Sequence, residues 1–397
     1  MDIRKRRYAK LLLECLKIEN KDYLFVQIPT FLSDFKEILL EESKNFNLKE
    51  VYFYEIDPFK KKELIEYLDE ENIYKHPMFN LSIFNKYAKL DAAFLFIDSM
   101  VPHLMDGIDE ELLKRIKLHE RKSQEYFRDL YEGNKLYWLI AGVPNEYWSN
   151  DLNLTLNELW EYIFKVTLID SDNPYESWIK KLDESVKRAD ILNKYHFEYL
   201  KYRNKLGTDL TIYLPKLHKW GSGYGLDKSI CNLPTEEIFT SPDYLKTDGI
   251  VYNTKPLLYN NILIDDFYIK FENGKVVDFN AKKGHDTLKS IIETDENSCY
   301  LGECALVSFN SPINNTNLIF KSTLYDENAS CHLALGMGFI ECLDIDNDID
   351  YKDIPKYGVN TSKTHVDFMI GDDTLTIDGY TYDGKCIRIM ENGDLII

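Results

Sequence analysis

Histidine and acidic residues stand close together at several places in the second half of the chain. In "HVDFMIG", His365 and Asp367 are two residues apart. On a β-strand this spacing places both side chains on one face, with Val366 and Phe368 on the other. A rigid strand can present such a pair to one metal ion. A hydrogen-bonded histidine and aspartate pair at a sheet surface is the alternative for this motif alone.

Two other stretches place carboxylates in apolar or restricted surroundings. Glu303 is the single charge in "YLGECALV", and buried carboxylates are rare unless they are paired or bind a metal. "PTEEIFTSP" holds Glu236 and Glu237 between two prolines. Adjacent carboxylates can face different ways, so one can bind a metal while the other acts as general base on the metal-bound water. Solvent-exposed glutamates are the alternative in both stretches.

Cys331 and His332 are neighbours in "DENASCHLALG". Neighbouring side chains of an extended chain point to opposite faces, so they are badly placed to pair with each other. A cysteine nucleophile needs its base within hydrogen-bond reach, and the sequence therefore disfavours this chemistry. For His332, a buried core position and a metal ligand both remain open.

Six residues of these stretches, four carboxylates and two imidazoles, form a combined candidate ligand set. An oxygen-rich set of this kind suits divalent cations such as zinc, manganese or cobalt. Four carboxylates carry about the charge that two dications would neutralise, and a dinuclear hydrolase with a bridging water is the chemistry that follows. The candidate ligands are Glu237, Glu303, Glu327, His332, His365 and Asp367.

The first half of the chain carries the pattern of alternating strands and helices. Four β-rich runs, separated by amphipathic segments, predict βαβ units and a largely parallel sheet. Two helical stretches follow, and the second extends over 175–204, after Pro174. The β-rich runs cover 22–29, 50–57, 91–98 and 136–144.

The composition changes near residue 207, since only three of the 18 glycines precede it. Asp-Gly and Asn-Gly pairs at 248, 273, 378, 383 and 392 predict hairpin turns among short β-rich runs. We therefore expect an α+β multidomain protein. Its N-terminal α/β domain, with a helical extension, would span 1–206, and a β-rich metal-binding domain would span 207–397.

The overall composition restricts the partners of the protein. A formal charge of −19 would repel nucleic acid and anionic membranes. No window approaches the roughly 20 apolar residues of a membrane span, which leads us to expect a cytoplasmic protein. The seven cysteines show no CxxC pair, so neither a disulfide framework nor a zinc-finger cage is indicated.

Five blocks, in the order in which they occur, resemble the thermophilic aminopeptidase family, a group of aminopeptidase T-like dinuclear metallopeptidases. The similarity extends over nearly the whole chain and includes "LWEYIFKVTLIDSDNPYESW" and "GTDLTIYLP". The blocks are "NLPTEEIFTSPD", "YLGECALV", "SPINNTNLIF", "TLYDENASCHLALG" and "NTSKTHVDFMIG".

The resemblance implies a catalytic C-terminal domain, a homodimer and a cytoplasmic exopeptidase that uses two divalent ions (Zn, Co or Mn). Its substrates would be peptides with a free N-terminus. Glu303 would act in catalysis as the ligand that bridges both ions, and Glu327 would be a sixth ligand. Glu236 as general base rests on analogy with other two-metal aminopeptidases, in which a glutamate adjoins a ligand glutamate. The other implied ligands are Glu237, His332, His365 and Asp367.

One position departs from the family pattern. Seven residues after His332 the family has a tyrosine, and this chain has Phe339. Loss of a phenol that hydrogen-bonds the reacting group can cost on the order of a hundredfold in rate. Phe339 supports one alternative to an active aminopeptidase, a weakened relative that serves as a metal-loaded, peptide-binding dimer. A dinuclear hydrolase of another amide is a further alternative that does not depend on Phe339.

Overall fold

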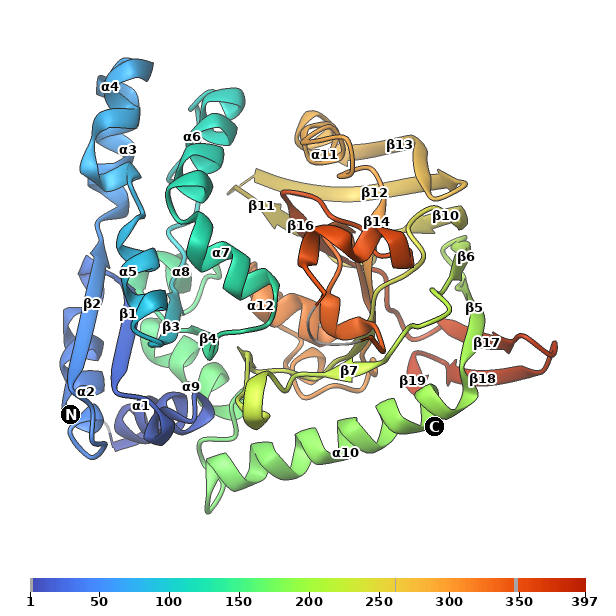
Figure 1. Ribbon diagram of the computed structural model, residues 1–397, viewed down its shortest axis with the longest axis horizontal. Helices are drawn as coiled ribbons and strands as arrows, with labels where there is room; N and C mark the ends of the chain where they lie inside the picture. Colours follow the sequence, from blue (N-terminus) through green and yellow to red (C-terminus); the bar gives the residue numbers. More distant parts are fainter. Residues whose placement is uncertain (1–2, 261, 346–348) are drawn as a thin grey trace. The chain divides into compact units, whose positions relative to one another are not determined.

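The computed structural model describes residues 3–260, 262–345 and 349–397 (Figure 1). The chain forms two compact units. The N-terminal unit comprises Met1–Ile179 with Tyr224–Pro234, and the C-terminal unit comprises Lys180–Gly223 with Thr235–Ile397. The domain boundary between residues 206 and 207 stays a prediction.

The N-terminal unit contains a parallel sheet in the strand order β2-β1-β3-β4-β8. Its main strands coincide with the β-rich runs of the sequence, so the predicted parallel sheet is confirmed. The buried faces of these strands supply aromatic side chains to one cluster around Phe25, Phe84 and Phe94. The strands are β1 (Tyr23–Pro29), β2 (Glu50–Ile56), β3 (Ala93–Asp98), β4 (Trp138–Gly142) and β8 (Asn232–Leu233).

Helices connect and cover these strands, as the blue to green part of Figure 1 shows. Several begin at an Asp, Asn or Thr whose side chain accepts a hydrogen bond from a backbone N–H of the first turn. These N-cap bonds satisfy donors that have no partner within the helix and so stabilise its first turn. The helices are α1 (Ile3–Cys15), α2 (Ser33–Ser43), α3 (Pro58–Tyr67), α4 (Glu70–Lys75), α5 (Ile83–Lys89), α6 (Glu110–Ser123), α7 (Glu125–Glu132), α8 (Glu146–Asp151) and α9 (Leu156–Val166).

The long helix predicted over 175–204 is wrong in its last part. Helix α10 (Pro174–Tyr195) ends before His196, which adopts a left-handed backbone with φ of 48°. Strand β5 (Phe197–Arg203) follows. Its buried side chains come from Phe197, Leu200 and Tyr202, and strand pairing on both sides overrides the helical pattern here.

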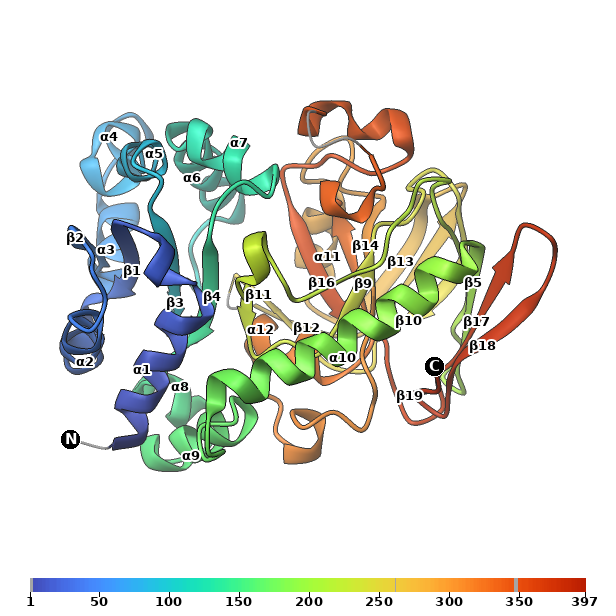
Figure 2. The same ribbon diagram turned by 60° about the horizontal axis from the view of Figure 1, so that its bottom comes forward.

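The C-terminal unit contains a large antiparallel sheet in the order β11-β12-β10-β6-β5-β17-β18-β19, with β13 paired to β12. Figure 2 shows strands of this sheet in yellow, green and red. The remaining strands of this sheet are β6 (Asp209–Tyr213), β10 (Thr247–Tyr252), β11 (Leu257–Tyr259), β12 (Ile262–Glu272), β13 (Lys275–Lys283), β17 (Thr376–Thr381), β18 (Cys386–Glu391) and β19 (Asp394–Leu395).

The hairpin predictions are confirmed at three of the five glycine pairs. The pairs that begin at 273, 383 and 392 lie between the strands of hairpins. The predictions at 248 and 378 are wrong, because both pairs lie inside strands, β10 and β17. A Cβ on Gly249 would lie 2.1 Å from the Asp209 carbonyl oxygen, so glycine there permits close strand approach instead of a turn.

A second antiparallel sheet, which we call the site sheet, has the order β16-β15-β14-β9-β7. Leu301, Leu333 and Phe368 of this sheet share one buried cluster with side chains of the large sheet, such as Leu200 and Ile269. The strands are β7 (Gly221–Ser222), β9 (Ile238–Thr240), β14 (Leu301–Leu306), β15 (His332–Gly336) and β16 (His365–Met369), and the helices of this unit besides α10 include α11 (His285–Ile292) and α12 (Thr323–Asp326).

The predicted fold class is confirmed. An N-terminal α/β part with a parallel sheet is joined to a β-rich C-terminal part. Among the described residues, no helix combines the length and the apolar character that a membrane crossing requires.

Candidate metal centre

The site sheet directs its apolar residues to one face and its candidate ligands to the other. Along β16, Val366 and Phe368 enter the shared core, so His365 and Asp367 project from the opposite face. In the strand register, Glu303 of β14 and Asp367 of β16 both stand opposite Ala334 of β15. The small alanine side chain leaves room for the two carboxylates to approach each other.

A local irregularity sets the position of Glu303. The register of β14 against β15 shifts between Leu301 and Glu303, which makes Gly302 the bulged residue. A Cβ on Gly302 would lie 2.1 Å from the Met337 carbonyl oxygen. Glycine is therefore required for the close approach that aims Glu303 at its partners.

The first group of ligand atoms comprises Glu303, His365 and Asp367, and these atoms lie within 4.8 Å of one another. His365 Nε2 lies 3.2 Å from Glu303 Oε2 and 3.2 Å from Asp367 Oδ1. On the other side of the ring, Nδ1 lies 2.7 Å from the Met337 carbonyl oxygen. A carbonyl oxygen can only accept a hydrogen bond, so Nδ1 must carry the proton. Nε2 is then unprotonated and can serve as the ligand nitrogen.

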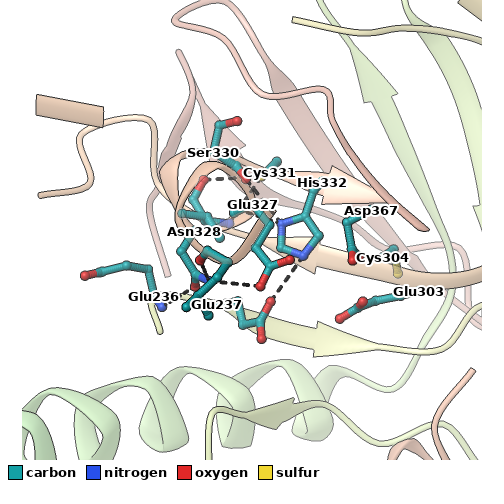
Figure 3. A network of polar contacts seen from close by, with 12 residues as sticks. Glu236, Glu237, Glu303, Cys304, Glu327, Asn328, Ser330, Cys331, His332 and Asp367 are labelled. Atoms are coloured by element: carbon teal, nitrogen blue, oxygen red, sulfur yellow. Dashed lines mark hydrogen bonds and ion pairs between the residues drawn. The ribbon is translucent and has the colours of Figure 1, made fainter. Parts of the chain in front are cut away.

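The second group comprises Glu237, Glu303 and His332, again with ligand atoms within 4.8 Å of one another. His332 Nε2 lies 3.1 Å from Glu237 Oε2, and Nδ1 lies 2.9 Å from the Glu327 carbonyl oxygen. Figure 3 shows both contacts, and the Glu303 carboxylate lies on the Nε2 side of the His332 ring. Glu303 belongs to both groups.

Both imidazoles thus have the arrangement of metal ligands in proteins. A ligating histidine almost always donates its other N–H to a carbonyl, a carboxylate or a water. The carbonyl partners here fix the ring orientation and keep Nε2 directed at the carboxylates.

The electrostatics of this group of side chains favour protons or metal ions. Burial, then the negative charges of Glu237 and Asp367, raise the pKa of Glu303 to about 7 against the opposing effect of His365. Burial also raises the pKa of Glu327 well above its ordinary value. Burial opposes a charge on His332, but the carboxylates around it, Glu237 above all, raise its pKa to about 10.

The donor set fits divalent metal ions. Four buried or nearly buried carboxylates meet two imidazoles, so even two fully protonated rings would leave net negative charge. Oxygen and imidazole nitrogen donors of this kind are the ligands of zinc, cobalt and manganese.

Two predicted residues lie differently from the rest. Glu327, in the 3-10 helix η6 (Glu327–Ala329), is buried and lies beside Glu237 in Figure 3, but it belongs to neither group of ligand atoms. Glu236 points away from the site in Figure 3. Its carboxylate forms an ion pair with Lys181 of α10.

Cys331 does not pair with His332. Its Sγ lies 3.3 Å from the Val307 carbonyl oxygen, on the core side of the sheet. Burial raises the pKa of this thiol to about 12, which suppresses the thiolate that a nucleophile requires. The structure therefore agrees with the sequence in disfavouring cysteine chemistry.

Sequence reasoning missed the residues that hold the candidate ligands in place. Asn328 is fully buried and bonds to both the 236–237 segment and Glu327. It follows a candidate ligand directly in the sequence, and this adjacency was the one available signal. The Met337 carbonyl that orients His365 leaves no signal in a side chain.

Comparisons with known proteins match almost the whole chain to one family model and to several relatives. The family model described as thermophilic metalloprotease (M29) matches residues 1–395. Aminopeptidase AmpS of Bacillus subtilis is 36% identical over 98% of this chain and 97% of its own length. Aminopeptidase 2 of Geobacillus stearothermophilus is 33% identical over 98% of this chain and 96% of its own. The solved structure of wild-type AmpT from Thermus thermophilus superposes with a TM-score of 0.88 at 26% identity, and all of both chains is covered.

We predict that the metal-free protein loses stability as the pH rises. Folding raises the pKa of Glu303 from 4.5 to about 7 and that of His332 from 6.5 to about 10. At pH values between the unfolded and the folded pKa of each group, the folded chain therefore binds more protons than the unfolded chain. The free energy of unfolding must then fall as the pH rises. Since a tenfold change in proton affinity is worth about 1.4 kcal/mol, the loss should reach at least about 2 kcal/mol.

Urea denaturation of chelator-treated protein between about pH 5 and about pH 9 measures this change. Glu303→Gln should flatten the lower part of the profile, because the amide does not titrate. A flat profile for the native metal-free protein would contradict the prediction.

Proposed function

Because the chain belongs to the thermophilic metalloprotease (M29) family, we propose that it is a cytoplasmic aminopeptidase that releases N-terminal amino acids from peptides with the help of two divalent metal ions. The predicted resemblance and enzyme class, a metallo-aminopeptidase, are confirmed by the family match and the relatives. The number and identity of the ions (Zn, Co or Mn), the homodimer and the cellular compartment belong to the proposal.

The observation that carries the two-metal proposal is the sharing of Glu303. One carboxylate stands between a group completed by Glu237 and His332 and a group completed by His365 and Asp367. A carboxylate has two oxygens and can serve two ions at once. We therefore propose Glu237 and His332 as ligands of one ion, His365 and Asp367 as ligands of the other, and Glu303 as the bridge.

Bound at these residues, the ions would lower the pKa of a water molecule and polarise the carbonyl of the scissile peptide bond. The chain itself supplies the orientation of the ligands. The two imidazole rings are fixed through Nδ1, and strand alternation keeps the apolar side chains on the other face of the sheet.

The general base needs a carboxylate that faces the reacting water. Glu236 stays a prediction for this role, although its carboxylate is paired with Lys181 and points away in Figure 3. Glu327 is supported better by the geometry. It is buried beside Glu237 and belongs to neither group of ligand atoms, so its carboxylate stays available to accept a proton from a water bound at the site.

Phe339 lies at the edge of the site. Its ring centroid is 5.0 Å from that of His365 and 5.5 Å from that of Phe239. A phenol at this position would stand beside a proposed ligand, where it could donate a hydrogen bond to the reacting group. Because Phe339 lies beside His365 and lacks this donor, its position supports a second candidate function, a weakened relative that binds peptides.

We expect the native protein to bind about two divalent ions per chain and to release amino acids from unblocked peptides but not from N-acetylated ones. Glu303→Ala should lose both ions and lower the activity at least about a hundredfold, because it removes a ligand of each group. Elemental analysis and peptide hydrolysis measure the two effects. Glu293→Ala, at an exposed glutamate after α11, is the matched control. Activity that survives exhaustive chelation would refute the proposal.

The two candidates for the base differ in a measurable way. Glu327→Gln should retain two ions and lower kcat by about a hundredfold or more, because the amide cannot accept the proton. Glu236→Gln should change kcat less than about tenfold. A larger loss in Glu236→Gln would return the role to Glu236, and loss of an ion in Glu327→Gln would make Glu327 the sixth ligand.

Phe339→Tyr should raise kcat by up to about a hundredfold, since it restores a donor next to His365. Phe239→Tyr places a phenol on the neighbouring ring and serves as the control. If both variants bind as much metal as the native protein, a change in kcat arises from catalysis and not from metal binding. A native rate that is already high and does not change in Phe339→Tyr would dismiss the weakened-relative alternative.

A further inference from the structure

Asn328 connects two parts of the candidate site that are far apart in sequence. Its Oδ1 accepts the Glu236 backbone N–H at 2.7 Å. Its Nδ2 donates to the Leu324 carbonyl oxygen at 3.0 Å and to Glu327 Oε1 at 3.3 Å. Figure 3 shows Asn328 between Glu236 and Glu327.

The partners determine which way the amide faces. A backbone N–H can only donate and a backbone carbonyl can only accept, so the oxygen of Asn328 must face Glu236 and its nitrogen must face Leu324. The residue is fully buried. A substitution would therefore leave buried polar groups without partners, where water cannot easily replace the lost bonds.

The segment that Asn328 holds has little other support from the sheet. Residues 235–237 lie between Pro234 and the start of β9 at Ile238, outside any strand ladder. The Glu236 N–H is bound by Asn328, and the Glu236 carboxylate is bound by Lys181. Glu237, the next residue, depends on these anchors for its position beside His332.

We propose that Asn328 is a positioning residue that fixes Glu237 and Glu327 relative to each other, and thereby sets the affinity of the metal position formed by Glu237, Glu303 and His332. This inference rests on the proposed function. Residues that orient ligands typically contribute 10- to 100-fold to metal affinity.

The effect should be confined to one of the two metal positions. His365 and Asp367 lie in β16, whose pairing with β15 fixes both residues, and the Met337 carbonyl orients His365. These supports do not pass through Asn328. The group of Glu303, His365 and Asp367 should therefore keep its affinity when Asn328 is replaced.

The test is a calorimetric titration of the full metal-free chain with Zn²⁺ or Mn²⁺. In Asn328→Leu and Asn328→Asp, one binding step should weaken about 10- to 100-fold and the other should stay unchanged. Asn328→Asp keeps an acceptor for the Glu236 N–H but places an oxygen against Glu327, so it tests the loss of the donating side of the amide alone.

Two background variants identify the step that weakens. His365→Ala keeps the group of Glu237, Glu303 and His332, and in this background the Asn328 substitutions should weaken the remaining step. Glu237→Ala keeps the group of Glu303, His365 and Asp367, and there the same substitutions should have no effect.

Asn145 provides a matched control for the loss of a buried asparagine. Its Oδ1 also accepts a backbone N–H, from Trp148, and its Nδ2 also donates twice, to Ser99 and Met100. It lies in the N-terminal unit. Asn145→Leu should lower the melting temperature without changing either metal affinity.

Unchanged titrations in both Asn328 variants would overturn the inference, and so would an equal weakening of both steps. A native chain with no metal-dependent peptide hydrolysis would instead overturn the proposed function. Because hydrolysis and metal titration of the native chain are both measured before any variant, the two failures are distinguishable.

Discussion

The burial of several carboxylates on one face of the site sheet is the constraint on which the C-terminal unit depends. Glu237, Glu303, Glu327 and Asp367 are each at most 8% exposed. Removing charged groups from water costs several kcal/mol each unless opposite charge compensates for it. Two imidazoles supply part of that compensation, and raised carboxyl pKa values mark the part that they do not supply. Fold and the proposed metal binding are therefore linked, since a dication bound at these carboxylates would stabilise the same arrangement that the strands impose.

The supports of the candidate ligands differ in kind. Glu303, His332, His365 and Asp367 lie in β14, β15 and β16, where ladder hydrogen bonds fix the backbone and alternation fixes the face. Glu237 and Glu327 lie outside these strands, in segments that need side-chain bonds to hold them. The strand residues form a rigid base, and the others depend on anchors such as Asn328 and Lys181.

The sequence was informative where a local rule decides the outcome. The parallel strands were predictable from β-rich runs that alternate with amphipathic segments, and the orientation of His365 and Asp367 follows from the period of a strand. It was less informative where tertiary pairing overrides the local pattern. Residues 197–203 continue a helical pattern but pair as β5, and the glycines at 249 and 379 permit close contacts within strands instead of turns. Contacts of Asn328 and of the Met337 carbonyl depend on the fold and could not be read from spacing.

The same limit explains why the paired glutamates at 236 and 237 were hard to interpret. Adjacent residues of an extended segment face opposite ways, so the sequence correctly implies two different environments for them. It does not say which environment contains the site. The structure directs Glu237 to His332 and Glu236 to Lys181 of α10, a helix whose residue 181 is 55 positions away in the chain. An ion pair of this kind holds the backbone on one side while the neighbouring carboxylate faces the proposed metals. Glu236 can therefore support the site through the position of Glu237, whether or not its own carboxylate takes part in proton transfer.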